Sequence, residues 1–131
     1  MTSAEPALRA IALSKAYGKR LAVDHLDLQV DRGELFGFLG PNGAGKTTTI
    51  RMALGLIAPT NGSIEILGLE VRHNRSKVLP RVGALVESPA LYGYLSGRNN
   101  LRAFGDLLGG VSNKRIDEVL EIGRASCRER V

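Results

Sequence analysis

The segment Leu35–Leu56, LFGFLGPNGAGKTTTIRMALGL, constrains the fold of this chain more than any other stretch. It starts with the continuous apolar run Leu35–Leu39, which is typical of a strand covered on both faces of a sheet. Glycines then interrupt the run, and apolar residues follow at the spacing of a helix packed on that sheet: Ile50, Ala53, Leu54 and Ile57. This order of strand, glycine-rich loop and helix predicts an α/β fold.

The glycine-rich loop matches the Walker A phosphate-binding pattern, G-x-x-x-x-G-K-[ST]. The residues that fix the pattern are Gly40, Gly45, Lys46 and Thr47. Glycines let the backbone turn tightly, so that its N–H groups point at phosphate oxygens, and the following helix adds its positive N-terminal end. In such a loop Lys46 reaches the β- and γ-phosphates and the Thr47 hydroxyl holds Mg²⁺. The loop therefore predicts a nucleoside triphosphate site; the alternative is a glycine-rich turn with a surface lysine.

The rest of the chain supplies further elements. Four segments are predicted as strands: Leu8–Leu13, His25–Val30, Ser63–Leu67 and Val82–Val86. We expect the first two to be half-buried and antiparallel. The helix after the loop is predicted to stop at APTNG, where Pro59 and Gly62 stand. Ser96 and Ser112 each precede apolar residues at helical spacing, so each is predicted to cap a helix.

Composition excludes several classes of protein. The 131 residues, 44% of them hydrophobic, suffice for one globular domain at most. No apolar run approaches the roughly 20 residues that span a bilayer and no signal-peptide pattern is present, so we expect a cytoplasmic protein. The charge of +5 is scattered with few aromatics, which favours solvated faces over nucleic acid. Cys127 is the only cysteine, and His25 and His73 have no partners at ligand spacing.

The sequence LSKAYGKR…GPNGAGKTTT…GSIEILG resembles the start of an ABC transporter ATP-binding subunit. The similarity runs from Leu8 to about Glu121. The resemblance implies a P-loop fold of ABC type, with an antiparallel layer, part of the nucleotide-binding core and the start of the helical subdomain. It also implies that the whole loop binds the phosphates of ATP. The loop residues are Gly40, Pro41, Asn42, Gly43, Ala44, Gly45, Lys46, Thr47 and Thr48.

Two further positions follow from this resemblance. Tyr17 in KAYG matches the aromatic residue that stacks on adenine; the alternative is a partly buried strand-end tyrosine. Glu87 stands where the family has a glutamine that senses the γ-phosphate and meets the membrane subunit. A glutamate there resembles the branch that exports bacitracin-type and lantibiotic peptides. Its carboxylate is a candidate for catalysis and for Mg²⁺ binding, and the alternative is a surface glutamate.

Other elements of the ABC cycle do not occur in the sequence. The family uses an LSGGQ signature, a strand ending in aspartate, a catalytic glutamate and a switch histidine. The segment Tyr94–Arg98, YLSGR, lacks the second glycine and the glutamine of the signature. Without the aspartate and the glutamate, Mg²⁺ loses an anchor and water lacks a general base. We therefore expect this chain to bind ATP weakly and not to hydrolyse it.

The segment Ile122–Val131, IGRASCRERV, has no apolar period. It reads either as a charged, solvated tail or as the translation of a common sequencing adapter. Our hypothesis is that residues 1–121 are the N-terminal part of one ABC ATP-binding domain and residues 122–131 are not native. Such a truncation would leave Leu35–Leu39 at an unpaired apolar edge, so we expect poor solubility.

The resemblance also implies a function for the parent protein. ATP binding and hydrolysis would drive export of a drug or peptide, as in antibiotic resistance, through a separate membrane-spanning permease. Two ATP-binding subunits would form the ATP sandwich on the inner face of the plasma membrane. The alternatives are a non-transport ABC protein acting on ribosomes or DNA, a P-loop kinase or GTPase, and an inert nucleotide-binding fragment.

Overall fold

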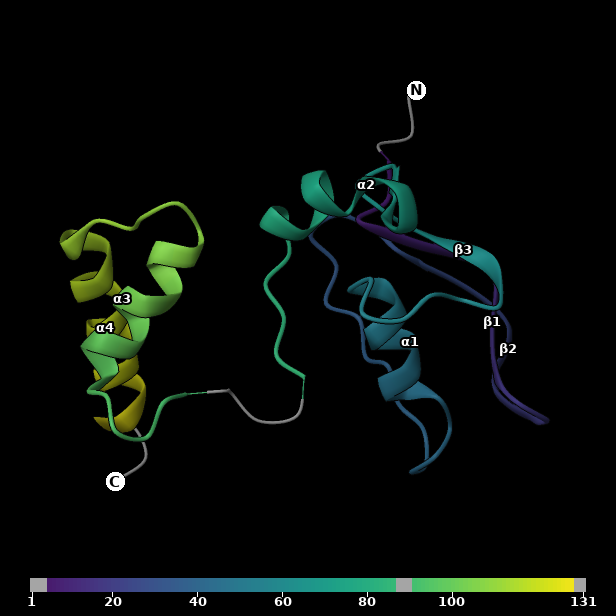
Figure 1. Cartoon of the computed structure of the whole chain (residues 1–131), viewed down its shortest axis with the longest axis horizontal. Coiled ribbons are helices and arrows are strands. Elements are labelled where there is room, and N and C mark those ends of the chain that lie inside the picture. Colours follow the sequence, from purple (N-terminus) through teal and green to yellow (C-terminus); the bar gives the residue numbers. More distant parts are fainter. Residues whose placement is uncertain (1–4, 87–90, 129–131) are drawn as a thin grey trace. The chain divides into compact units, whose positions relative to one another are not determined.

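The computed structural model of the chain describes residues 5–86 and 91–128. These residues fall into two compact units, Met1–Val86 and Glu87–Val131. The first unit holds a sheet with helices on it, and the second holds two helices (Figure 1). Because the candidate phosphate loop lies in the first unit, that unit positions the site.

The sheet of the first unit is antiparallel throughout and has the strand order β2-β1-β3-β4. Its strands are β1 (Leu8–Tyr17), β2 (Arg20–Val30), β3 (Asn61–Ile66) and β4 (Leu69–Glu70). Leu8 in β1 pairs with Val30 on one side and with Ile66 on the other. Three predicted strands are thus confirmed, although β1 and β2 extend further toward their shared turn than their apolar patterns indicate.

The β1–β2 pair is irregular at its middle, where Ala12 and His25 have positive φ angles of 44° and 45°. Side chains supply hydrogen bonds there. Asp27 Oδ1 accepts from the Ala12 N–H at 2.7 Å, and Ser14 Oγ accepts from the His25 N–H at 2.9 Å. His25 itself is an exposed residue beside Asp24, and among the described residues no cluster of His, Cys, Asp and Glu could hold a metal ion.

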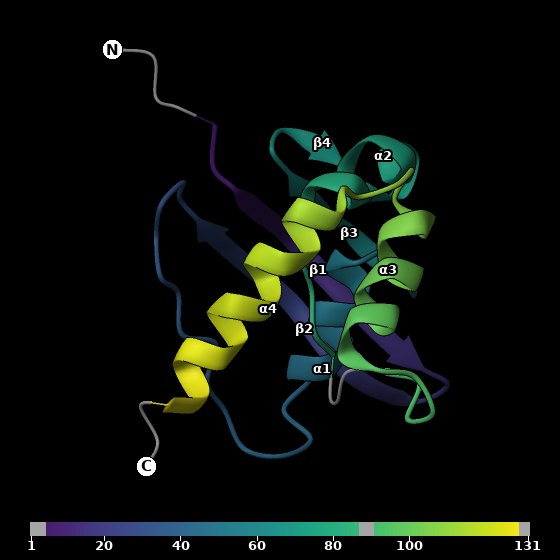
Figure 2. The same ribbon diagram turned by 90° about the vertical axis from the view of Figure 1, so that its left-hand side faces the viewer.

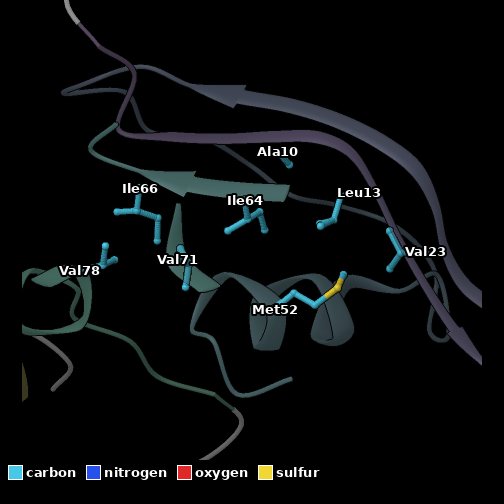
Figure 3. Close-up of a cluster of buried hydrophobic side chains, with 8 residues drawn as sticks. All are labelled: Ala10, Leu13, Val23, Met52, Ile64, Ile66, Val71 and Val78. Atoms are coloured by element: carbon cyan, nitrogen blue, oxygen red, sulfur yellow. The ribbon is translucent and has the colours of Figure 1, made fainter. Parts of the chain in front are cut away.

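Two helices and a short 3-10 turn complete the first unit: α1 (Lys46–Ala53), α2 (Val71–Val78) and η1 (Leu79–Arg81). The core lies between the sheet and the two helices (Figure 3). The buried side chains are Ala10, Leu13, Val23, Met52, Ile64, Ile66, Val71 and Val78. Each strand and helix that carries them thereby buries one apolar face, and together they form one continuous cluster.

Two predicted strands are wrong for the described residues. Leu35–Leu39 has no strand pairing, and Leu35 and Leu39 are 101% and 92% exposed. Val82–Val86 likewise forms no strand, and Leu85 is exposed. An apolar run becomes a strand only when a neighbouring strand accepts its backbone hydrogen bonds, and no described strand lies beside either segment. Helix α1 also ends at Ala53, earlier than predicted.

The second unit consists of α3 (Gly97–Leu107) and α4 (Asn113–Arg128), which pack against each other (Figure 2). Both predicted caps are confirmed. Ser96 Oγ accepts from the Asn99 N–H at 3.3 Å, and Ser112 Oγ accepts from the Arg115 N–H at 3.2 Å. Helix α4 continues beyond Glu121, where the apolar period ends. The non-native origin of residues 122–131 stays a prediction, because helical backbone does not test it.

Asn100 organises the segment that precedes α3. Its side chain is buried, and Oδ1 accepts from the Tyr92 N–H at 2.8 Å. Nδ2 lies 3.1 Å from the Tyr92 carbonyl and 3.2 Å from those of Leu95 and Ser96. One buried amide thus contacts four backbone groups. It is the partner of the Tyr92 N–H and the Leu95 carbonyl, whereas the Tyr92 and Ser96 carbonyls also accept from the Leu95 and Asn100 N–H groups.

Asn100→Ala is expected to loosen the start of α3, because backbone groups in this part of the unit lose their hydrogen bonds at a cost of about 1–3 kcal/mol. Native-state hydrogen exchange should show α3 amides exchanging about 10-fold faster or more. Asn99→Ala is the matched control, since Asn99 is exposed on the same helix. Equal protection in the two variants would contradict this role for Asn100.

Candidate nucleotide-binding site

Gly45 joins the loop to α1 at a point where only glycine fits. Its φ angle is +90°, a region that residues with a side chain rarely adopt. A Cβ at this position would lie 2.4 Å from the Ala22 carbonyl oxygen and 3.1 Å from Val23 Cγ2, both in β2. The loop therefore lies directly against β2, and the second glycine of the motif is what permits that approach.

The loop is closed by hydrogen bonds on either side of Gly45. The Ala44 N–H donates to the Pro41 carbonyl at 3.2 Å. The Thr49 N–H and hydroxyl donate to the Gly45 carbonyl at 2.9 Å and 3.0 Å. No side chain caps the N-terminus of α1. Its first N–H groups therefore have no intrahelical partner and are available to an anion, as the sequence predicts.

Lys46 folds back over the loop that it follows. Its Nζ donates to the carbonyl oxygens of Gly40 and of Pro41, the latter at 2.8 Å. An ammonium group has three N–H donors, so one remains for a phosphate oxygen. The loop charge is favourable as well, because residues 35–64 contain Lys46 and Arg51 but no Asp or Glu. Both features favour an anionic ligand.

The three threonines that follow differ in their surroundings. Thr49 is buried, and its hydroxyl is occupied by the Gly45 carbonyl. Thr47 is exposed and Thr48 is partly buried. Thr47 is therefore the most exposed of the three threonines at the helix start. Its place beside Mg²⁺ remains a prediction. Asn42 and Gly43 are exposed in the loop, and a Cβ on Gly43 would meet nothing within 4 Å.

Tyr17 lies at the end of β1, paired with Arg20, and is 51% exposed. The Lys15 ammonium lies 5.3 Å from its ring centroid and donates to the Ala58 carbonyl at 2.7 Å. Sequence reasoning missed Lys15, although alternation along a strand places residues 15 and 17 on the same face. The β1–β2 pair that carries Tyr17 also contacts the loop at Gly45. Stacking on adenine remains a prediction.

Glu87 lies outside the described residues, so its catalytic and metal-binding roles remain predictions too. In the described part of the chain, no helix has both the length and the apolar character needed to cross a bilayer.

A glycine loop, a lysine held over that loop and an uncapped helix start are the features of a P-loop. Residues 23–129 match the protein family described as ABC transporter. The chain therefore belongs to the ABC transporter family, as the sequence of its loop predicts.

Individual relatives agree with this assignment. The chain is 51% identical over 110 residues to the bacitracin transport ATP-binding protein BcrA of Bacillus licheniformis, covering 84% of this chain and 36% of BcrA. It is 38% identical over 110 residues to the Enterococcus faecalis protein of the same name, with the same coverage. A solved ATP-binding subunit of an ABC transporter superposes with a TM-score of 0.70 at 32% identity, covering 82% of this chain and 44% of that one. The ABC type of the fold is thus confirmed, and the chain spans about a third of the length of these curated relatives.

Proposed function

We propose that this chain belongs to the ATP-binding subunit of an exporter for a drug or a peptide antibiotic. In that protein, ATP binding and hydrolysis would be coupled to transport through a separate membrane-spanning permease, with a second ATP-binding subunit completing the dimer. The subunit would lie on the cytoplasmic face of the membrane. Support comes from the similarity to two bacitracin transport ATP-binding proteins.

For the chain itself we propose ATP binding with Mg²⁺ at the loop and no hydrolysis. The position of Lys46 carries this proposal, because its ammonium lies over the loop with a donor to spare. The residues fit the ligand: the helix start is uncapped and no acidic residue repels phosphate in residues 35–64. Mg²⁺ prefers oxygen ligands and would neutralise phosphate charge when bound.

Each loop residue then has a defined task. Backbone N–H groups of residues 40–48 would bind phosphate oxygens, with the glycines allowing close approach. Lys46 would contact the β- and γ-phosphates, and the Thr47 hydroxyl would hold the metal. In the family, water activation needs a glutamate just after a strand that ends in aspartate, and no described strand of this chain ends in aspartate.

Lys46→Ala is expected to weaken ATP binding about 10- to 100-fold, because hydrogen bonds to charged groups contribute about 1.5–3 kcal/mol. Isothermal titration calorimetry with ATP and Mg²⁺ on the whole chain measures the change. Lys77→Ala is the control, since Lys77 is an exposed lysine on α2 and is expected to leave the affinity unchanged. Equal ATP affinities for the wild-type chain, Lys46→Ala and Lys77→Ala would contradict the proposed site. The same samples should release no phosphate from ATP.

A further inference from the structure

A second concave site lies in the first unit, away from the phosphate loop. It has a volume of about 230 Å³ and lies between the end of α1 and the start of α2; we call it the α1–α2 pocket. Met52, Ile64 and Val71 belong both to its lining and to the core, where Figure 3 labels them. Because these side chains are fixed by core packing, the apolar part of the pocket is preformed.

The exposed part of the lining is basic. Arg72 and Arg75 line the pocket, and among the described residues neither side chain has a hydrogen-bond or ion-pair partner. Arg75 lies against Gly55, where its Nε is 3.1 Å from the place of the missing Cβ. A guanidinium group has five N–H donors in a fixed plane, a geometry suited to carboxylate and phosphate.

One acidic residue, Glu70, also lines the pocket. Its Oε2 lies 2.8 Å from His73 Nδ1, so the carboxylate already has a partner. The lining thus carries two guanidinium groups against one carboxylate, and that carboxylate is already paired. The potential at the pocket therefore favours an anion despite Glu70.

We propose that the α1–α2 pocket binds amphiphilic anions, in which one anionic head group is joined to an apolar chain. The apolar chain would lie against Met52, Ile64 and the half-exposed Leu56, and the head group would bind Arg72 and Arg75. A small polar anion would leave the apolar surface wet, and a neutral apolar ligand would leave both guanidinium groups unused. This site shares no residue with the phosphate loop, so it does not rest on the proposed function.

Octyl phosphate, used below its micelle concentration, is a suitable probe. Its binding is measured by calorimetry on the whole chain carrying Lys46→Ala, because this substitution weakens the phosphate loop as a competing site for octyl phosphate. We expect octyl phosphate to bind more tightly than inorganic phosphate or octanol. Across a series from butyl to octyl phosphate, the affinity should rise by about three- to fourfold for each further CH₂ that is buried. Equal affinities for octyl and inorganic phosphate would overturn the proposal.

Substitutions test the residues directly. Arg72→Ala and Arg75→Ala are each expected to weaken octyl phosphate binding about 10-fold. Both arginines are exposed, so neither change should unfold the chain, which circular dichroism verifies. Arg81→Ala is the matched control outside the lining and should change nothing. Leu56→Ser should reduce the dependence on chain length. A loss in Arg81→Ala as large as in the other two, or competition by ATP in the wild-type chain, would overturn the site.

An amphiphilic anion could be a membrane lipid or a soluble molecule, and binding to lipid vesicles distinguishes the two. If the Arg72→Ala/Arg75→Ala double variant binds phosphatidylglycerol vesicles more weakly than the wild-type chain, the site takes a membrane lipid. If vesicle binding is unchanged while octyl phosphate binding is lost, the site takes a soluble amphiphile. If the double variant retains octyl phosphate binding, the proposal is wrong.

Discussion

Gly45→Ala is expected to destabilise the first unit by about 3 kcal/mol. A left-handed backbone costs a residue with a Cβ about 1–2 kcal/mol. The new methyl group would also lie 2.4 Å from the Ala22 carbonyl, so α1 or β2 must move, and such overpacking costs about 1–3 kcal/mol. Because that movement displaces the loop, ATP affinity should fall together with stability.

Urea unfolding of the whole chain measures this loss, and Gly43→Ala is the matched control. Gly43 has a similar φ of +85°, but a Cβ there would meet nothing within 4 Å. The control therefore bears the backbone cost alone, about 1–2 kcal/mol. If the two variants are equally stable, the close approach of β2 to the loop is not what requires glycine at position 45.

Leu13→Ala is expected to cost about 3 kcal/mol of unfolding free energy. Leu13 is fully buried in β1 and belongs to the cluster that joins the sheet to α1 (Figure 3). Truncation removes buried methyl groups and leaves a cavity that the strands can fill only in part. The urea midpoint should fall while the slope of the transition stays constant.

Leu21→Ala is the control for that measurement, because Leu21 lies on the neighbouring strand and is 51% exposed. Its truncation is expected to cost less than about 1 kcal/mol. Similar midpoints for the two variants would show that the first unit does not depend on the core around Leu13. A drop in thermal stability of the second unit alone would contradict the prediction as well.

Local pattern predicted the parts of the fold that depend on neighbours in sequence. The motif Gly40–Thr47 predicted the loop and the start of α1, and the serines at 96 and 112 predicted two helix starts, because caps act within one turn. Helix α2 was not predicted. It buries only Val71 and Val78, which gives no apolar stripe, and Asn74 interrupts it with non-helical angles.

By itself, the sequence determined that a loop of the Walker A pattern joins an apolar segment to a helix, and that the loop sequence is of ABC type. Whether Leu35–Leu39 is a strand was decided by tertiary structure, since a ladder needs a neighbouring strand and none of the described strands lies there. Tertiary structure likewise decided the contact of Gly45 with β2 and the opening between α1 and α2. Both join residues distant in the chain, and their distances follow from packing, which local residue pattern does not encode.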